Sequence, residues 1–373
     1  MRRSRITSWR FTSALVCGTA AAGVLFACTL TQSLDYLQKG DGGGVTVAEA
    51  GDGPSGEGGA EGGGRVPVWQ VTGQTKPGFL ALDAVNVYWI ADNKVFSVPK
   101  ATGGTPKLLG PVPPNTSALT ADTDPAGFVF AAVATNVLRF PKDGSGAGGA
   151  VTVFAPPVGA TNADTIGADD SSLFVLQVDM TGAGGDARVL RMAKDGGAPT
   201  DISGDGGATT MTLDPSSLLW LSADPNVLAF IQHAKAAPGG TDSAVFTLAP
   251  NDNLPAFSSE IAVDATNLYW LTTDAASTKA LIVSRKRQPA ASAVTIYLGT
   301  TDDMLDDIAI DDQYVYALDT HASSVLRVPK GGGDREDLLT GLKQPTSLAV
   351  DQSGIYVSDA VAGMNGVILK IAR

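Results

Sequence analysis

Cysteine is almost absent from this chain. The 373 residues include only Cys17 and Cys28, and both lie near the N-terminus. Beyond residue 28 the chain has no thiol, so a disulfide framework is excluded there. The fold must then be held by packing alone, which suits a large domain that draws its core from the 44% of residues that are hydrophobic.

Positive charge is also scarce. The chain has 26 basic and 38 acidic residues, which gives a formal net charge of -12. The segment before Cys28 holds four arginines and no acidic residue, so its removal would take the net charge to -16. An acidic surface repels phosphate backbones and anionic lipid headgroups, so we expect no nucleic-acid partner. The charge favours solubility or, in a narrower interpretation, a cationic partner.

The apolar run at residues 11–27 is short for a membrane span, at 17 residues rich in alanine and glycine. Together with the basic residues 1–10 it has the form of a secretory signal. It ends in Leu25-Phe26-Ala27-Cys28, which resembles the bacterial lipobox. The resemblance implies that residues 1–27 are a lipoprotein signal peptide, that Cys28 is the lipid attachment residue, and that the protein is exported and anchored in the cell envelope. Thr29 after the cysteine favours the outer membrane.

Residues 28–64 are expected to form a tether between this anchor and a folded domain. Twelve of the 25 residues from 40 to 64 are glycine, and such a segment cannot bury enough apolar surface to fold. A flexible tether of this length would span roughly 35 Å on average.

Residues 65–373 contain a pattern that returns seven times: a short strand that ends in aspartate, a turn, and a strand rich in aromatic and β-branched residues. The aspartates are Asp83, Asp122, Asp169, Asp214, Asp264, Asp311 and Asp351, at intervals of 39 to 50 residues. This interval is typical of a four-stranded propeller blade. The sequence therefore predicts an all-β fold, a β-propeller of about seven four-stranded blades.

The ends of this region predict how the ring closes. The last repeat lacks a fourth strand, while residues 66–73 form a spare strand before the first repeat. The run from residue 69 to 84 also aligns with that from 337 to 352. We therefore expect the N-terminal strand to complete the last blade, which would hide the edges that an open ring exposes.

The sequence of the repeats resembles that of the YWTD and NHL-type propellers. Tyr88-Trp89-Ile90-Ala91-Asp92 and Tyr269-Trp270-Leu271-Thr272-Thr273-Asp274 carry the resemblance, while Tyr316-Ala317-Leu318-Asp319 keeps the tyrosine and aspartate and loses the tryptophan. These families mainly bind proteins or ligands, and their relatives include metal-dependent lactonases and streptogramin B lyases. The resemblance therefore implies a propeller and leaves its function open.

Histidine, the usual proton shuttle and metal ligand, occurs only at His233 and His321. His233 falls near the end of a third strand and His321 in a loop between second and third strands, so we expect them at different blades and heights. We interpret both as surface or capping residues. No Ser-His-Asp arrangement can be built on them.

Two repeated or clustered charge patterns have a structural and a functional interpretation. One acidic segment could attract calcium or could simply be a solvated loop; it holds Asp302, Asp303, Asp306, Asp307, Asp311 and Asp312. The aspartates of the repeat are expected to cap turns. A lysine follows most third strands, and we expect these residues to be solubility charges on the outer rim: Lys100, Lys142, Lys194, Lys235, Lys286 and Lys330.

The sequence favours a non-enzymatic binding module for a protein or glycan ligand, with no assigned cofactor. Loops between second and third strands differ in length, from 91–93 to 179–186 and 272–278, and divergent loops on an even scaffold are where binding is usually found. The alternative is a metal-dependent propeller hydrolase or lyase, similar to the lactonases, which would need several polar side chains converging on the ring axis.

Overall fold

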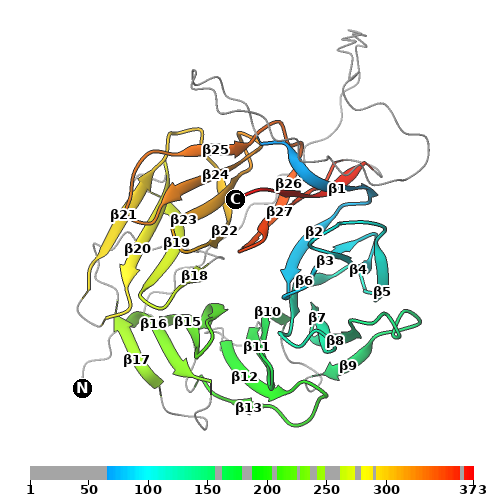
Figure 1. Cartoon of the computed structure of the whole chain (residues 1–373). Coiled ribbons are helices and arrows are strands. Elements are labelled where there is room, and N and C mark those ends of the chain that lie inside the picture. Colours follow the sequence, from blue (N-terminus) through cyan, green and yellow to red (C-terminus); the bar gives the residue numbers. More distant parts are fainter. Residues whose placement is uncertain are drawn as a thin grey trace, which may run out of the picture. The chain divides into compact units, whose positions relative to one another are not determined.

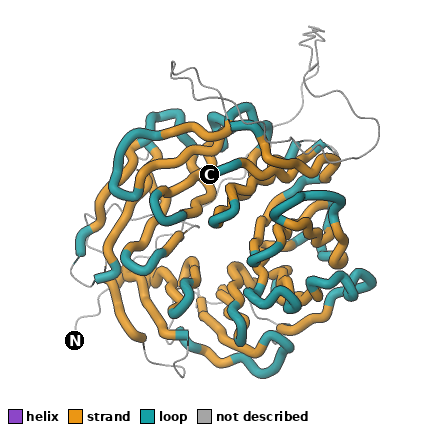
Figure 2. Tube along the Cα trace, viewed as in Figure 1, coloured by secondary structure: helices purple, strands orange, loops and turns teal. Residues whose placement is uncertain are grey.

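The structure, a computed structural model, describes residues 65–155, 162–178, 187–203, 208–224, 227–235, 242–247, 261–273, 279–288, 291–361 and 365–373. These residues form seven four-stranded antiparallel sheets arranged around a common centre (Figures 1 and 2). This confirms the predicted all-β propeller of seven blades. The predicted signal peptide (1–27), Cys28 and the predicted tether (28–64) lie outside the described residues. Within the described ranges, no helix is long and apolar enough to cross a membrane.

The blades are numbered here in chain order, and their strands follow one another from the centre of the ring outward (Figure 1). Blade 1 contains β2 (Gly78–Leu82), β3 (Asn86–Ala91), β4 (Lys94–Pro99) and β5 (Lys107–Pro111); blade 2 contains β6 (Thr116–Ala121), β7 (Phe128–Val133), β8 (Asn136–Pro141) and β9 (Val151–Phe154). Blade 3 contains β10 (Asn162–Ala168), β11 (Ser172–Val178), β12 (Ala187–Ala193) and β13 (Thr200–Asp201); blade 4 contains β14 (Ala208–Leu213), β15 (Ser217–Asp224), β16 (Val227–Ala234) and β17 (Asp242–Thr247). Blade 5 contains β18 (Ile261–Val263), β19 (Asn267–Thr273), β20 (Ala280–Lys286) and β21 (Ala293–Leu298); blade 6 contains β22 (Leu305–Ile310), β23 (Tyr314–Asp319), β24 (Ser324–Pro329) and β25 (Glu336–Leu339). Blade 7 contains β26 (Pro345–Asp351), β27 (Gly354–Asp359), β28 (Gly366–Ile371) and β1 (Pro67–Gln74).

Blade 7 closes the ring, because its outer strand β1 comes from the start of the propeller. β1 pairs antiparallel with β28, with Val71 opposite Ile368. Trp69 on β1 is buried, its Nε1 donates to the carbonyl oxygen of Lys100 in blade 1 at 3.0 Å, and its ring centre lies 6.0 Å from that of Tyr356. The predicted closure by the N-terminal strand is confirmed, and Trp69 joins blade 7 to blade 1.

The hydrophobic core lies between neighbouring blades. The second strand of each blade is sandwiched between two sheets, so it buries both of its faces and has a continuous apolar run in place of alternation. In blade 1 every residue from Val87 to Ala91 is buried. The bulky second-strand residues Trp89, Phe130, Trp220 and Trp270 are each at most 1% exposed, so aromatic packing holds the blades apart at a fixed spacing.

Seven ion pairs join the blades on one face of the ring. The cation that follows the third strand of each blade contacts the aspartate between the first and second strands of the preceding blade. The pairs are Lys100–Asp351, Lys142–Asp83, Lys194–Asp122, Lys235–Asp169, Arg287–Asp214, Lys330–Asp264 and Arg373–Asp311. Because Lys100 of blade 1 contacts Asp351 of blade 7, the series runs around the whole circle. We call these fourteen residues the ion-pair ring.

The prediction that the recurring lysines are outer-rim solubility charges is wrong. Lys100 and Lys142 are buried, and Lys194, Lys235 and Lys330 are at most 15% exposed at their side chains. Among the six, Lys286 alone is exposed, because Arg287 takes its place in the ring. A charged residue near a strand points into solvent only where that part of the sheet faces solvent. These cations instead follow the third strand into the gap between two blades.

The expected role of the repeated aspartates as turn caps is confirmed. One carboxylate oxygen of Asp83 accepts the N–H groups of Val85 and Asn86, both at 2.7 Å. Its second oxygen accepts the Tyr88 hydroxyl at 2.6 Å and lies 2.9 Å from Nζ of Lys142. One side chain therefore shapes the turn and also joins two blades.

Inner strands carry a β-bulge near their start, on the face opposite the ion-pair ring. The register shifts between Gly78 and Ala81 in β2, between Leu305 and Ile308 in β22, and between Pro345 and Ser347 in β26. A bulge leaves residues without a partner and re-aims their side chains. We call this side of the ring the bulge face.

Candidate functional site

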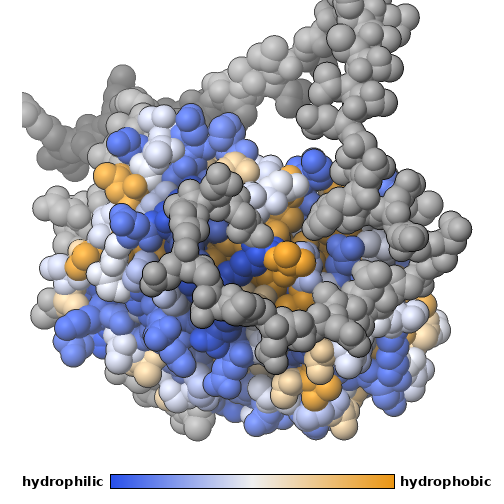
Figure 3. All heavy atoms as spheres, turned by 45° about the horizontal axis from the view of Figure 1, so that its top comes forward, coloured by the Kyte–Doolittle hydropathy of each residue, from blue (hydrophilic) through white to orange (hydrophobic). Residues whose placement is uncertain are grey.

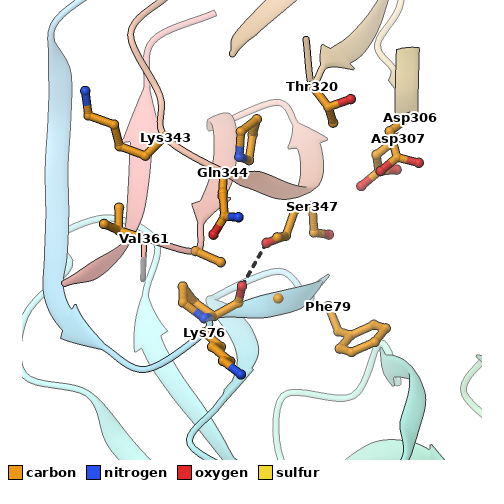
Figure 4. A pocket seen from close by; sticks show the side chains of 14 residues that line it. Lys76, Phe79, Asp306, Asp307, Thr320, Lys343, Gln344, Ser347 and Val361 are labelled. Atoms are coloured by element: carbon orange, nitrogen blue, oxygen red, sulfur yellow. Dashed lines mark hydrogen bonds between the residues drawn. The ribbon is translucent and has the colours of Figure 1, made fainter. Parts of the chain in front are cut away.

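A cavity of about 800 Å³ opens on the bulge face, where blades 6, 7 and 1 meet (Figure 4). Its walls come from the starts of β22, β26 and β2 and from the loops beside them. This volume is within the range of pockets that hold small ligands. We call this cavity the bulge-face pocket.

Asp306 and Asp307 form one side of the pocket, and both lie in the β22 bulge. Asp307 is half-buried, and its carboxylate accepts the N–H of Leu348 in blade 7 at 2.6 Å. Burial, aided by the nearby charge of Asp306, raises the pKa of Asp307 to about 6. Asp306 is exposed. The pocket therefore holds one carboxylate that is fully solvated and one that is partly desolvated.

These two carboxylates differ from the aspartates of the ion-pair ring. Among the described residues, neither Asp306 nor Asp307 has a lysine or arginine within ion-pair distance, whereas each ring aspartate has one. Partners lower the pKa of ring members: that of Asp264, beside Lys330, falls to about 2. The acidic charge on the bulge face is thus left available to a ligand.

Phe79 lies at the pocket rim in the β2 bulge, with a left-handed backbone (φ 54°) and 40% of its surface exposed. Phe79 lies four residues before the repeat aspartate of its blade, Asp83. Asp307 and Ser347 occupy the same position in blades 6 and 7. Those two accept the N–H of the next blade's inner strand, Asp307 from Leu348 and Ser347 from Leu80, the latter at 3.1 Å. A phenyl ring cannot accept such a bond, so Phe79 does not join the inner strands of blades 1 and 2 in this way.

The other side of the pocket carries Lys343, Gln344 and Val361, with Lys76 below them in the view of Figure 4. Asp359 fixes this wall, because its carboxylate accepts the N–H of Lys343 at 3.0 Å and that of Gln344 at 2.6 Å. Asp359 ends the second strand of blade 7, at the position of the aspartate in the YWTD-like motif. The motif aspartate therefore holds the loop that enters its own blade.

Asp319, at the same position in blade 6, has a matching role. It accepts N–H groups from Met304 at 3.3 Å and from Ala322 at 3.0 Å, and Arg335 pairs with it at 2.9 Å. Across the pocket floor, the Thr346 hydroxyl donates to the carbonyl oxygen of Pro77 at 2.7 Å (Figure 4). Hydrogen bonds within blades 6 and 7, and one that reaches blade 1, thus hold the pocket walls in place.

The predicted acidic segment does not act as one cluster. Asp303 pairs with Arg335 at 3.2 Å, and Asp311 belongs to the ion-pair ring on the other face. Asp302 and Asp312 are exposed, and Asp306 and Asp307 line the pocket. Over the described ranges, no three His, Cys, Asp or Glu side chains are placed to hold a metal ion.

The two histidines lie in different blades, as predicted. His321 is exposed in the turn between β23 and β24. His233 is on β16 and only 1% exposed, with its ring centre 6.2 Å from that of Trp220. The prediction that both are surface or capping residues is therefore wrong for His233, which packs inside blade 4. Neither histidine is among the residues that line the pocket.

The predicted binding loops contribute only in part. The connection at 91–93 is a tight turn, while residues 179–186 and 274–278 lie outside the described residues. The pocket is instead built mainly by the connections that lead from the outer strand of one blade to the inner strand of the next. Sequence reasoning missed Lys76, Phe79 and Lys343. Comparing the residues four positions before each repeat aspartate would have shown Phe79 as the one aromatic residue at that position.

A second cavity, of about 510 Å³, lies on the ion-pair face between blades 4 and 5. Its charged residues are already paired, Asp214 with Arg287 at 2.5 Å and Asp264 with Lys330 at 2.6 Å. Hydrophilic residues cover most of the described surface in Figure 3, and hydrophobic residues gather near the middle of that view. Phe79 and Met304, both on the bulge face, are among the exposed large hydrophobic side chains.

No protein-family model matches the chain, and no curated protein matches it. Among solved structures it is similar to a streptogramin B lyase (12% identity over 82% of this chain and 97% of that one, TM-score 0.58). It is also similar to the virginiamycin B lyase from Staphylococcus aureus (15%, 80% and 95%, TM-score 0.56) and to the Kuenenia stuttgartiensis hydrazine synthase (10%, 80% and 96%, TM-score 0.58). At these identities the likeness shows the β-propeller fold and says nothing of activity.

Proposed function

We propose that this protein is a cell-envelope lipoprotein, anchored in the outer membrane through Cys28, whose propeller is a non-enzymatic binding module with the bulge-face pocket as its ligand site. One observation carries the proposal: a preformed cavity of about 800 Å³ combines apolar lining with two carboxylates that pair with no lysine or arginine among the described residues. Such a cavity is the default ligand site of a folded domain. The pocket's titratable groups are two carboxylates and two lysines, which lie on different sides of the cavity.

The course of β1 supports this role. The N–H of Arg65 donates to the carbonyl oxygen of Leu338 at 2.7 Å, and its guanidinium donates to that of Ala372 at 2.8 Å. β1 then begins beside the end of β28, next to Arg373 of the ion-pair ring. The described part of the chain thus enters the propeller on the ion-pair face, opposite the pocket.

Anchoring is tested by fractionating cells that express the full-length chain, with Cys28→Ala compared with Cys17→Ala. We expect Cys28→Ala to move the protein from the membrane to the soluble fraction, because the acyl chains would have no attachment point. Cys17→Ala should remain in the membrane. Membrane association of Cys28→Ala would refute the lipid anchor.

Binding is tested by filling the pocket. A Cβ at Gly78 would meet only the Thr346 hydroxyl, at an ordinary 3.7 Å, so Gly78→Leu should fold and occupy the cavity. Gly331→Leu is the control, because Gly331 is exposed on the ion-pair face with no atom within 4 Å of an added Cβ. Thermal unfolding is followed with amines, amino acids, sugars, lactones and calcium.

A ligand at 100 times its dissociation constant should stabilise the wild type and Gly331→Leu by about 2.7 kcal/mol, and Gly78→Leu much less. A stabilisation that Gly78→Leu retains would place binding elsewhere. A calcium-dependent rise in midpoint together with lactone hydrolysis would favour the alternative, a metal-dependent propeller hydrolase or lyase.

A further inference from the structure

We infer that the bulge-face pocket binds a ligand that carries one ammonium group on an apolar body. The inference rests on the proposed binding function and names the class of its ligand. It follows from where the pocket places its negative charge, its aromatic ring and its positive charge.

The negative side selects a cation. Asp306 and Asp307 lie next to each other in the β22 bulge, and no described lysine or arginine is within ion-pair distance of either. The Leu348 N–H at 2.6 Å, the Ser347 side chain and the Ile308 backbone occupy part of the acceptor capacity of Asp307, and the exposed carboxylate of Asp306 adds further acceptors. The remaining oxygens can accept hydrogen bonds from an ammonium group, and such charge-assisted bonds are among the stronger ones in proteins. A bound cation would also relieve the repulsion between the two carboxylates.

The apolar side selects the body of the ligand. Phe79, Pro77, Val361 and Ala360 line the same cavity, and Phe79 exposes 40% of its surface there. An aromatic ring in the same cavity as a carboxylate pair can contact the apolar part of an amine. A ligand without an apolar part would leave this surface in contact with water.

The positive side limits the ligand to one cation. Lys343 and Lys76 line the pocket away from the aspartates (Figure 4). A second ammonium at the far end of the ligand would meet these like charges, so a diamine should bind more weakly than a monoamine. The whole chain is acidic, so its net charge alone would attract any polycation. Because of the two lysines, the pocket itself should prefer a ligand with a single positive charge.

The test is calorimetric titration of the full-length chain in detergent with three probes. They are 2-phenylethylamine, the similarly sized anion 3-phenylpropionate, and 1,5-diaminopentane. We expect 2-phenylethylamine to bind at least about tenfold more tightly than either other probe. The double variant Asp306→Asn/Asp307→Asn should weaken amine binding at least about tenfold, since it removes the charge of both acceptors. Asp312→Asn, an exposed aspartate outside the pocket, should bind like the wild type.

Asparagine keeps the shape of aspartate and can still accept the Leu348 N–H, so the double variant should unfold no earlier than the wild type. Stronger binding of 3-phenylpropionate, unchanged amine affinity in the double variant, or no amine binding at all would each overturn the inference. The proposed function survives any of these results if another compound stabilises the wild type but not Gly78→Leu, and it fails with the inference if none does.

Discussion

At the residue scale, the aspartates of this propeller have two different environments. Those of the ion-pair ring accept hydrogen bonds from turn N–H groups and face a cation, and these partners outweigh burial, so the pKa of Asp83, Asp214, Asp264, Asp311 and Asp351 falls. Asp307 has the burial without the cation, so its pKa rises to about 6. The same side chain thus stabilises one face and remains available on the other.

The buried pair of Lys142 with Asp83 and Asp122 should be far more costly to break than an exposed pair. Its side chains are at most 1% exposed, at distances of 2.9 and 3.0 Å. Lys142→Ala leaves the buried carboxylate of Asp83 without its cation, while Asp122 keeps Lys194, and should lower the free energy of unfolding by about 3–5 kcal/mol. Lys94→Ala removes an exposed pair with Asp92 and should cost less than about 1 kcal/mol. Urea unfolding measures both, and equal losses would contradict the account of the ring.

Asp307 should lower stability at neutral pH. Because its folded pKa of about 6 exceeds the unfolded value, the folded state holds its proton more tightly, and stability is lost as pH rises from about 4 through 6. Asp307→Asn should therefore raise the unfolding midpoint at pH 7 and leave it unchanged at pH 4. Asp312→Asn, exposed and outside the pocket, serves as the control. A midpoint of Asp307→Asn below that of the wild type at pH 7 would show that its charge stabilises the fold.

At the element scale, the strands could be predicted because their cause is local. A second strand such as Val87–Ala91 is buried on both sides and must be continuously apolar, and the aspartate before it must cap a turn, so both appear in the sequence at each repeat. The bulges could not be predicted in this way. Phe79, Asp307 and Ser347 occupy one repeat position with unlike side chains, and only their inter-blade contacts show what the position does.

The closing strand β1 should be sensitive to its contact with blade 1. An added Cβ at Gly103 would lie 2.9 Å from the Trp69 ring, at a positive φ of 62°. Gly103→Ala should therefore destabilise by about 2–4 kcal/mol, through both overpacking and backbone strain. Gly341→Ala has a similar φ of 77° with no atom within 4 Å, and should cost about 1 kcal/mol. Thermal unfolding measures the loss of stability in both variants. Equal losses would mean that the Trp69 side chain can move aside without an energetic penalty.

At the scale of the whole molecule, the ion-pair ring makes the stability of the fold depend on acid pH. Asp264 has a folded pKa of about 2, so its share of stability is complete above about pH 4 and is lost as pH falls towards 2. Lys330 is one of several partners that lower this pKa, so Lys330→Gln should lower the free energy of unfolding at pH 7 by roughly 1 kcal/mol and hardly change it at pH 2. Lys286→Gln, outside the ring, should have no effect at either pH. Equal losses for Lys330→Gln at both pH values would rule out a charge effect.

The number of blades and the closure of the ring could also be predicted, because each repeat carries its own signal and the missing last strand has a visible replacement in residues 66–73. The ion-pair ring and the pocket could not, since each depends on which residues of neighbouring blades come together. Lys142 meets Asp83 across 59 positions and Asp307 meets Leu348 across 41, and spacing along the chain does not indicate either contact.

The most direct test of the binding function is to map where a ligand protects the molecule. Hydrogen exchange of the full-length chain would be measured with and without the compound that raises the unfolding midpoint most. We predict protection at residues 76–80, 304–308 and 343–348, around the bulge-face pocket. Protection confined to the turns of the ion-pair face would contradict a ligand site on the bulge face. So would equal protection of the wild type and of Gly78→Leu by the compound.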